Sequence, residues 1–287
     1  MKSHLIIGFG KWAKKNLDYL VNKDYFDQIY IKNRSIYKNY NSNKIIKKKE
    51  LEIILKKIKS VHICTPIKNH FYYLKKFFFL KKIIIEKPIF NQIEQFKILS
   101  KKRKDQYFVV NYIDLFNPLI NKIKKHIKDK KFKKIILNYS SQTKFFKPSY
   151  DFANEWLDHP LSFVLYIFNK FPKSKVVLDN VIKKKKLISR SIQINYFLKK
   201  YEIIIKLNCS KTIQRNIQII DEDGIHLFDL KKNIIYKNKK NIFKSKTTSF
   251  DNLYNSLFNK RYYSFQNTSF HKKIFLEKRK LQKKLLN

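Results

Sequence analysis

The chain of 287 residues is poor in cysteine, glycine, alanine and arginine, and it has no long apolar run. Its two cysteines, Cys64 and Cys209, are too few for a disulfide framework. No apolar run approaches the roughly 18 residues that a membrane-spanning helix needs. The first apolar stretch is short and predicts a strand, so we expect no signal peptide, no membrane association and a cytoplasmic location.

Acidic residues are also scarce, at 21 against 65 lysines and arginines, which gives a formal net charge of +44. Such a charge attracts phosphate backbones, and binding to nucleic acid is one alternative to consider. Only six of the basic residues are arginine, however, and the planar arginine fork is the usual reader of nucleic acid. The lysines are spread along the whole chain. We therefore expect incidental polyanion binding and no specific nucleic-acid partner.

What the chain does contain is a nucleotide-binding pattern at its N-terminus. An apolar run at residues 5–7 predicts a buried strand, and leucines at helical spacing predict a helix from about residue 11. The turn between them has the form G-x-G-x-x-A. Gly8 would allow the tight turn, Gly10 would let the backbone approach a pyrophosphate, and Ala13 would let helix and strand pack closely. The residues predicted to contact the cofactor here are Gly8, Phe9, Gly10, Lys11 and Trp12.

The glycine-poor composition strengthens this interpretation. The chain has three glycines and two alanines, and three of these five residues fill the pattern. A chain so poor in small residues would rarely place three of them at the required spacing by chance. The helix that follows would also present free N–H groups and a partial positive charge to the phosphates. We take the pattern as a dinucleotide site.

A second strand, predicted at residues 29–31, bears on the choice of cofactor. In a dinucleotide domain the end of this strand meets the adenosine ribose, where a carboxylate accepts from the 2′-hydroxyl and an arginine accommodates a 2′-phosphate. This chain has no carboxylate there and carries Asn33 and Arg34. The pattern predicts a preference for NADP over NAD. A solvated loop in a lysine-rich protein is the alternative.

Three further strands are predicted at residues 61–64, 83–85 and 107–110, separated by helices near 51–58, 71–78 and 93–99. The first ends in Thr65-Pro66 with His70 four residues after the proline, and the second ends in Glu86-Lys87-Pro88. The carboxyl ends of parallel strands meet at the ligand-binding edge of an open α/β sheet. We therefore expect both motifs beside the nucleotide.

The succession of G-x-G-x-x-A, T-P-x-x-x-H and I-I-I-E-K-P resembles the Gfo/Idh/MocA family of oxidoreductases. Its members use NAD(P) to oxidise or reduce carbonyl and hydroxyl carbons, chiefly of sugars, inositols and related polyols. The resemblance implies that Lys87 contacts substrate and ribose and helps to set the acid–base chemistry. It also implies that Thr65, Pro66, His70 and Glu86 shape the cofactor wall. The segment 111–118 resembles the family's crossing that ends in F-N-P, with Leu115 where the family often has arginine.

From about residue 131 the pattern changes to short strands in succession, which predicts an antiparallel sheet. The strands are predicted at 135–139, 175–178, 188–197, 203–207, 216–220 and 225–230. The last two are joined by Asp221-Glu222-Asp223-Gly224, a hairpin signal. Three carboxylates could also hold a metal, but we favour a solvated turn and assign no metal ligands. His62, His126, His226 and His271 show no partner pattern and receive no role.

The segment 155–160 interrupts these strands. In the family that the chain resembles, a helix carries D-x-x-x-H, and its histidine is the usual proton carrier. The spacing here puts Glu155 in the aspartate position and His159 in the histidine position, four residues apart and so on one helix face. Asp158 is the alternative carboxylate. Pro160 requires the helix to begin near His159 or to be kinked. The resemblance thus implies catalytic roles for Lys87, His159 and Glu155.

We therefore expect an α/β chain with a Rossmann-like NAD(P)-binding domain at residues 1–118. The rest, 119–287, should form an α+β domain with an open, mostly antiparallel sheet, and its terminal helix should pack back on the first domain. The expected function is hydride transfer between NADP or NAD and a secondary alcohol or carbonyl carbon of a sugar, sugar nucleotide or polyol, in a site between the domains. A cofactor-binding protein without turnover is the alternative. The resemblance also implies a homo-oligomer.

Overall fold

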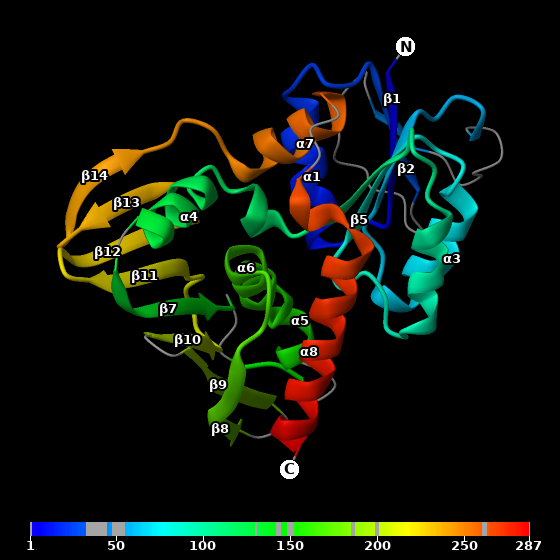
Figure 1. The fold of residues 1–287 in the computed structure, drawn as a ribbon. Coiled ribbons are helices and arrows are strands. Elements are labelled where there is room, and N and C mark those ends of the chain that lie inside the picture. The colour runs from blue at the N-terminus through cyan, green and yellow to red at the C-terminus, as the bar shows by residue number, and fades with distance from the viewer. Residues whose placement is uncertain are drawn as a thin grey trace. The chain divides into compact units, whose positions relative to one another are not determined.

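The structure is a computed structural model that describes residues 2–32, 45–47, 55–129, 131–141, 145–147, 152–184, 187–198, 201–259 and 263–286. It divides into two compact units (Figure 1). The first unit is Met1–Tyr112 with Leu253–Lys272, and the second unit is Ile113–Asn252 with Lys273–Asn287. The predicted division into domains at residue 118, with the returning terminal helix, stays a prediction, because a compact unit need not fold by itself.

The first unit is built on a six-stranded sheet in the order β3-β2-β1-β4-β5-β6, with every neighbouring pair parallel. Its strands are β1 (Ser3–Ile7), β2 (Gln28–Lys32), β3 (Ile45–Lys47), β4 (Ser60–Ile63), β5 (Lys82–Glu86) and β6 (Tyr107–Asn111). The central strands are buried along almost their whole length and are mostly apolar, as expected for a parallel sheet covered on both faces. The strand order reverses between β1 and β4, which is the switch point where such sheets bind ligands.

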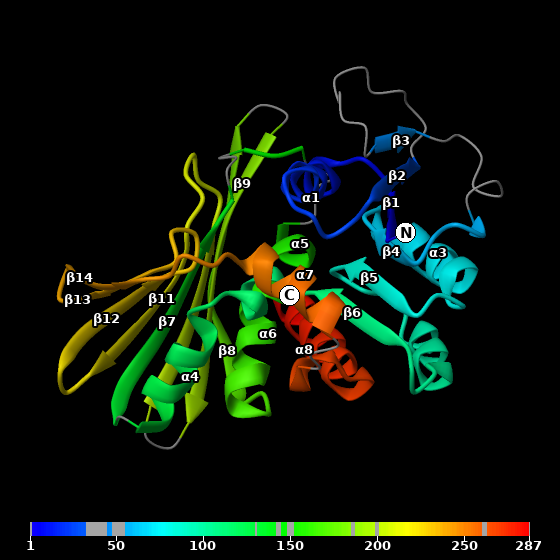
Figure 2. The same cartoon turned by 90° about the horizontal axis from the view of Figure 1, so that it is seen from above.

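Helices cover both faces of this sheet. Figure 2 shows α1 (Lys11–Val21) and α3 (His70–Phe77) on opposite faces. Helix α7 (Ser249–Asn259) lies beside α1, where the Tyr254 and Tyr19 rings stack with centroids 5.7 Å apart. The remaining elements of this unit are the 3₁₀ helices η1 (Ile67–Asn69), η2 (Glu94–Lys101) and η4 (Ser264–Gln266). The helix predicted at 93–99 is present and is of the 3₁₀ type. The first half of the helix predicted at 51–58 lies outside the described residues.

The second unit is built on an eight-stranded sheet in the order β14-β13-β12-β11-β7-β10-β9-β8. All neighbouring pairs are antiparallel except β7 and β10. Its strands are β7 (Phe132–Ser140), β8 (Lys173–Lys184), β9 (Leu187–Leu198), β10 (Tyr201–Asn208), β11 (Arg215–Asp221), β12 (Gly224–Asp229), β13 (Ile234–Lys237) and β14 (Lys240–Lys244). The mostly antiparallel sheet is confirmed, including the hairpin at Asp221–Gly224.

In the described part of this unit, the sheet is accompanied by the first turn of α7 and by η3 (Ile113–Phe116), α4 (Ile120–Asp129), α5 (Phe152–Trp156), α6 (Asp158–Phe168) and the later part of α8 (Thr268–Leu286). Figures 1 and 2 both show α4 and α6 on one face of the sheet. The Tyr196 hydroxyl of β9 lies 3.0 Å from Glu277 Oε1 and ties α8 to the strands. Within the described ranges, no helix is long and apolar enough to cross a membrane.

Candidate active site

The loop after β1 requires glycine at Gly8. Its φ is +90°, a conformation that a side chain disfavours, and a Cβ there would lie 2.6 Å from the Cys64 carbonyl oxygen. The Gly8 amide donates to the Lys32 carbonyl at 3.0 Å, while the Cys64 amide donates to Ile7 at 2.8 Å. These bonds hold the turn against the ends of both neighbouring strands, at the switch point of the sheet.

The mouth of this loop is open at Gly10. A Cβ at Gly10 would meet no atom of the described residues within 4 Å. Helix α1 begins at Lys11, and in the described chain its N-terminus has no side-chain cap and no acidic residue in its first turn. A pyrophosphate would fit here, because the uncapped N-terminus of α1 follows Gly10, which has no side chain to block it. The Phe9 ring is buried, Trp12 is half-buried and Lys11 is exposed.

The loop after β4 carries Thr65 and Pro66. The Thr65 hydroxyl is buried and has no hydrogen-bond partner in the part of the chain that the structure describes. Pro66 is exposed, and His70 is buried just behind the loop. A buried hydroxyl seldom lacks a partner, so the Thr65 side chain fits a site that a polar ligand completes.

His70 joins this loop to the one after β5. Its Nε2 lies 2.7 Å from the Thr65 carbonyl oxygen, and its Nδ1 lies 3.0 Å from the Pro88 carbonyl oxygen. Burial lowers the pKa of His70, although the nearby carbonyls oppose this shift. His70, the histidine of T-P-x-x-x-H, thus contacts the backbone of the loop after β4 and of the loop after β5 and holds the two loops together.

Glu86, at the end of β5, lies in a buried polar network of the first unit. Its Oε1 accepts from Asn111 Nδ2 at 2.8 Å and lies 3.0 Å from His62 Nε2. His62 Nδ1 lies 3.2 Å from the Tyr254 hydroxyl, which donates to Asn16 Oδ1 at 2.8 Å. Both ring nitrogens of His62 thus face an oxygen: Nδ1 faces the Tyr254 hydroxyl and Nε2 faces Glu86.

The network places His62 Nε2 against the buried Glu86 carboxylate, 3.0 Å from Oε1. Burial alone would raise the pKa of Glu86, but the bonds from His62 and Asn111 lower it overall. The Glu86 carboxylate is therefore held in the interior, next to Lys87 in the chain. Lys87 is half-buried, and the Lys87–Pro88 peptide bond is cis. Asn33 and Arg34 lie outside the described residues, so the cofactor preference stays a prediction.

His159, in the second unit, is the second residue of α6, which begins at Asp158. Pro160 therefore lies in the first turn of the helix, where a backbone N–H would have no partner within the helix. Its lack of an N–H thus removes no helical hydrogen bond, and the predicted helix start near His159 is confirmed. The His159 side chain is 3% exposed, and its Nδ1 lies 2.7 Å from Asp114 Oδ2. Asp114 Oδ1 accepts from Arg215 Nη1 at 3.0 Å.

Asp114 stays ionised beside this histidine. Burial alone would raise its pKa, but the charges of Arg215 and His159 bring the pKa well below its usual range. A carboxylate on Nδ1 fixes the imidazole's orientation and leaves Nε2 as the atom that exchanges a proton. The Tyr139 ring is stacked on His159 at 5.8 Å, and the Trp156 ring lies 5.8 Å from it on a tilted plane. His159 is therefore held by charge and by ring packing.

The carboxylate that contacts His159 is Asp114, whereas the sequence favours Glu155 or Asp158 for this role. Asp158 instead forms a buried ion pair with Lys278 Nζ of α8, at 2.9 Å. Glu155 lies in the preceding helix, α5. Asp114 comes from the segment that ends in F-N-P, and its position in an apolar run was the available signal. Arg215 and Tyr139 carried no local signal.

The F-N-P segment itself is held by Asn117. Its Nδ2 donates to the Leu230 carbonyl oxygen and to Asn233 Oδ1, both at 2.8 Å. Leu115, which stands where the resembled family often has arginine, is buried. Asn117 thus anchors the segment that presents Asp114 to His159.

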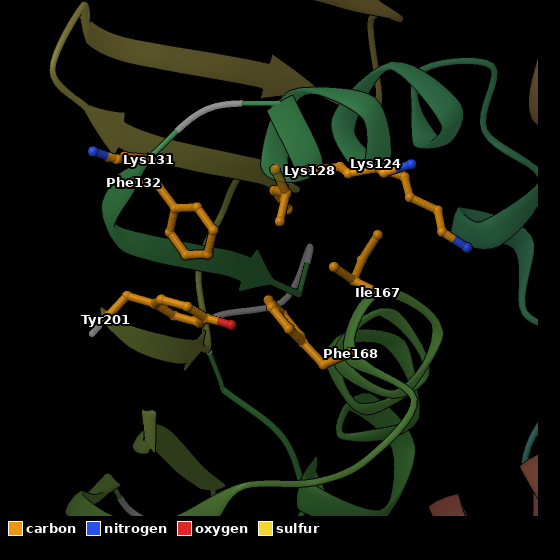
Figure 3. A pocket seen from close by; sticks show the side chains of 8 residues that line it. Lys124, Lys128, Lys131, Phe132, Ile167, Phe168 and Tyr201 are labelled. Atoms are coloured by element: carbon orange, nitrogen blue, oxygen red, sulfur yellow. The ribbon is translucent and has the colours of Figure 1, made fainter. Parts of the chain in front are cut away.

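Figure 3 shows a separate cavity of about 650 Å³ in the second unit, lined by Lys124, Ile127, Lys128, Lys131, Phe132, Ile167, Phe168 and Tyr201. The Phe132 and Tyr201 rings are in contact on tilted planes, with centroids 4.1 Å apart. The ammonium group of Lys124 lies over the Tyr166 ring, 4.5 Å from its centroid. His159 and Asp114 are not among the lining residues, so this cavity is distinct from their cluster.

Comparison with solved structures supports the predicted fold class. Neither a family model nor a curated protein sequence matches the chain. Among solved structures, the fold is similar to those of proteins named as oxidoreductases and dehydrogenases, which confirms the predicted fold class.

Three of these structures cover nearly the whole chain. A proposed oxidoreductase from Magnetospirillum magnetotacticum has a TM-score of 0.78 at 12% identity, covering 96% of this chain and 98% of its own. UDP-N-acetylglucosamine 3-dehydrogenase from Acidithiobacillus ferrooxidans has a TM-score of 0.71 at 13% identity, covering 98% and 96%. A myo-inositol dehydrogenase from Corynebacterium glutamicum has a TM-score of 0.71 at 11% identity, covering 99% and 96%. At such identities the likeness establishes the fold.

Proposed function

We propose that this chain is an NAD(P)-dependent oxidoreductase acting on a secondary alcohol or carbonyl carbon of a sugar, sugar nucleotide or polyol. The observation that carries the proposal is the open loop at Gly8 and Gly10, at the switch point of a parallel sheet and before an uncapped helix N-terminus. The buried Thr65 hydroxyl without a partner in the described chain adds to it. Two structures of the same fold are named as dehydrogenases of a sugar nucleotide and of myo-inositol.

The side chains divide the chemistry between them. Bound NADP(H) supplies or accepts a hydride at its nicotinamide ring. His159 Nε2 moves the substrate's hydroxyl proton, Asp114 holds the imidazole, and Lys87 polarises the substrate oxygen. Thr65 and Pro66 form part of the cofactor wall, with His70 and Glu86 positioning it. Glu155 is the remaining proposed catalytic residue.

The substitution Gly10→Ala tests the nucleotide site. Because Gly10 has a φ of −74° and open space around it, alanine is tolerated, and we expect the free energy of unfolding to change by about 0.5 kcal/mol or less. The added methyl group would occupy the pyrophosphate's place. We expect the Kd for NADPH to rise at least about tenfold, equal to about 1.4 kcal/mol. Nucleotide fluorescence titration and urea unfolding measure the two effects.

Gly8→Ala provides the matched contrast. Its positive φ and the close Cys64 carbonyl predict a loss of stability of about 1–3 kcal/mol. Unchanged NADPH affinity in a folded Gly10→Ala variant would contradict the site.

The second expected outcome concerns cofactor choice. A 2′-phosphate that gains a charge-assisted bond from Arg34 gains about 1.5–3 kcal/mol. We therefore expect kcat/KM for NADPH to exceed that for NADH at least about tenfold. In Arg34→Ala the ratio should fall toward unity, while kcat/KM for NADH stays unchanged. A preference of the unaltered protein for NADH would show the prediction wrong.

Two alternatives have their own tests. Steady NADP⁺ reduction with any member of a panel of sugars, sugar nucleotides and polyols, or NADPH oxidation with their keto derivatives, would exclude a cofactor-binding protein without turnover. DNA binding that vanishes at moderate salt and ignores sequence would mark nucleic-acid affinity as incidental. A homo-oligomer and a cytoplasmic location stay part of the proposal.

A further inference from the structure

Three side chains of the second unit converge away from the residues proposed for catalysis. They are His126 of α4, Asp221 at the end of β11 and His226 of β12. His126 Nε2 lies 2.7 Å from Asp221 Oδ2, and His226 Nε2 lies 3.5 Å from the same oxygen. The three ligand atoms all lie within 4.8 Å of one another. The imidazole rings are close together, with centroids 4.3 Å apart.

The local fold explains this convergence. The β11–β12 hairpin turns at Asp221–Gly224 and brings Asp221 near His226 on the next strand. Asp221 Oδ1 accepts from the Asp223 amide at 2.9 Å, which fixes the carboxylate and leaves Oδ2 for the histidines. The prediction of a solvated turn is therefore wrong for Asp221, whose side chain is 1% exposed. Glu222 and Asp223 are exposed.

The hydrogen bonding of this cluster is incomplete. His126 shares Asp221 Oδ2, but His226 Nε2 is buried and has no hydrogen bond within the described ranges. A buried imidazole nitrogen without a hydrogen bond, beside a carboxylate and a second imidazole, is a set of metal-ligand donors.

We propose that His126, Asp221 and His226 bind a divalent transition-metal ion, with Zn²⁺ as the preferred ion. Two imidazoles and one carboxylate suit zinc, and water would complete the four-coordinate site. Bonds of about 2.0–2.2 Å place tetrahedral ligand atoms roughly 3.3–3.6 Å apart. The distance of 3.5 Å between His226 Nε2 and Asp221 Oδ2 already lies in this range. The distance of 2.7 Å between His126 Nε2 and Asp221 Oδ2 would have to increase by less than about 1 Å. Mg²⁺ and Ca²⁺, which prefer oxygen ligands, are poor candidates.

A second cluster, His62, Cys64 and Glu86, also brings its ligand atoms within 4.8 Å of one another. Its hydrogen bonding is already complete at the histidine, because both ring nitrogens have partners in Tyr254 and Glu86. Burial raises the pKa of the Cys64 thiol well above its usual value, which disfavours the thiolate that binds metals. This cluster therefore serves as the control.

The test uses the untagged full chain, stripped with a chelator and dialysed. Zn²⁺ affinity is measured by competition with a chromogenic chelator, and Co²⁺ is titrated for its visible spectrum. We expect one equivalent of metal per chain, and a Co²⁺ spectrum typical of four-coordinate nitrogen and oxygen ligation without a thiolate charge-transfer band. His126→Gln and His226→Gln should each raise the Zn²⁺ Kd at least about tenfold, and Cys64→Ser should leave it unchanged.

Thermal unfolding gives an independent measurement. Zn²⁺ should raise the Tm of the unaltered protein and of Cys64→Ser, since a ligand that binds only the folded state stabilises it. The Tm of His226→Gln should not respond. Asp221→Asn, which keeps the acceptor for the Asp223 amide, gives another comparison if a histidine variant fails to fold. No binding at micromolar Zn²⁺, equal affinity in the histidine variants, or loss of binding in Cys64→Ser would overturn the proposal.

Discussion

Replacing His159 with asparagine is expected to lower kcat by about 10²–10⁴, the usual contribution of a positioned acid or base. The asparagine amide nitrogen takes the place of Nδ1 and keeps a donor for Asp114, which otherwise has only Arg215 in the described ion-pair cluster. The substitution removes Nε2, the atom proposed to move the proton. Steady-state kinetics with the substrate found by the panel measure the loss, and NADPH affinity should stay unchanged.

Two variants separate proton transfer from packing. His159→Ala should lose the same activity and also about 1–3 kcal/mol of stability, because the buried Asp114 then loses a partner. In Asp114→Asn, the limb of the pH–kcat profile should move to lower pH, because the protonated imidazole loses the adjacent negative charge. Full kcat in His159→Asn would show that His159 serves packing alone. An unmoved pH profile in Asp114→Asn would remove Asp114 as its positioning residue.

The fold of the first unit could be predicted because its signals are local. The buried strands β1 and β5 each contain a short apolar run, and the turn after β1 uses two of the chain's three glycines. The sequence does not predict strands β13 and β14, because the turn between them lacks a glycine. This turn places Asn238 and Lys239 at φ values of 47° and 71°, where glycine is the residue that usually marks a turn of this kind.

The site was predictable only as far as its motifs reach. Lys87 and His159 stand in short patterns, whereas their partners come from elsewhere in the chain. Arg215 lies 101 residues from Asp114, and Asp221 lies 95 residues from His126. Local periodicity cannot predict contacts between residues so far apart in the chain, since these contacts depend on which strands and helices pack together. Three of the four histidines that receive no role from the sequence, His62, His126 and His226, lie in clusters of this long-range kind.

Replacing Lys87 with methionine should also lower kcat by about 10²–10⁴ if its ammonium group polarises the substrate oxygen. Methionine keeps an apolar stem of similar length, so packing at the end of β5 is preserved. The neighbouring Glu86 carboxylate stays fixed by His62 and Asn111 in the absence of the lysine charge. We therefore expect NADPH affinity to fall less than about tenfold while turnover is lost, a split that stopped-flow and equilibrium titration can measure.

Lys82→Met is the matched control, because Lys82 begins the same strand that Lys87 follows, and its removal costs the same charge. Its ammonium group lies over the Phe258 ring, 4.8 Å from the centroid, so only a small loss of stability is expected. With kcat unchanged in Lys82→Met and lost in Lys87→Met, general electrostatic attraction of an anionic substrate or cofactor is excluded. Equal losses in the two variants would assign the effect to the chain's large positive charge and leave Lys87 without a catalytic role.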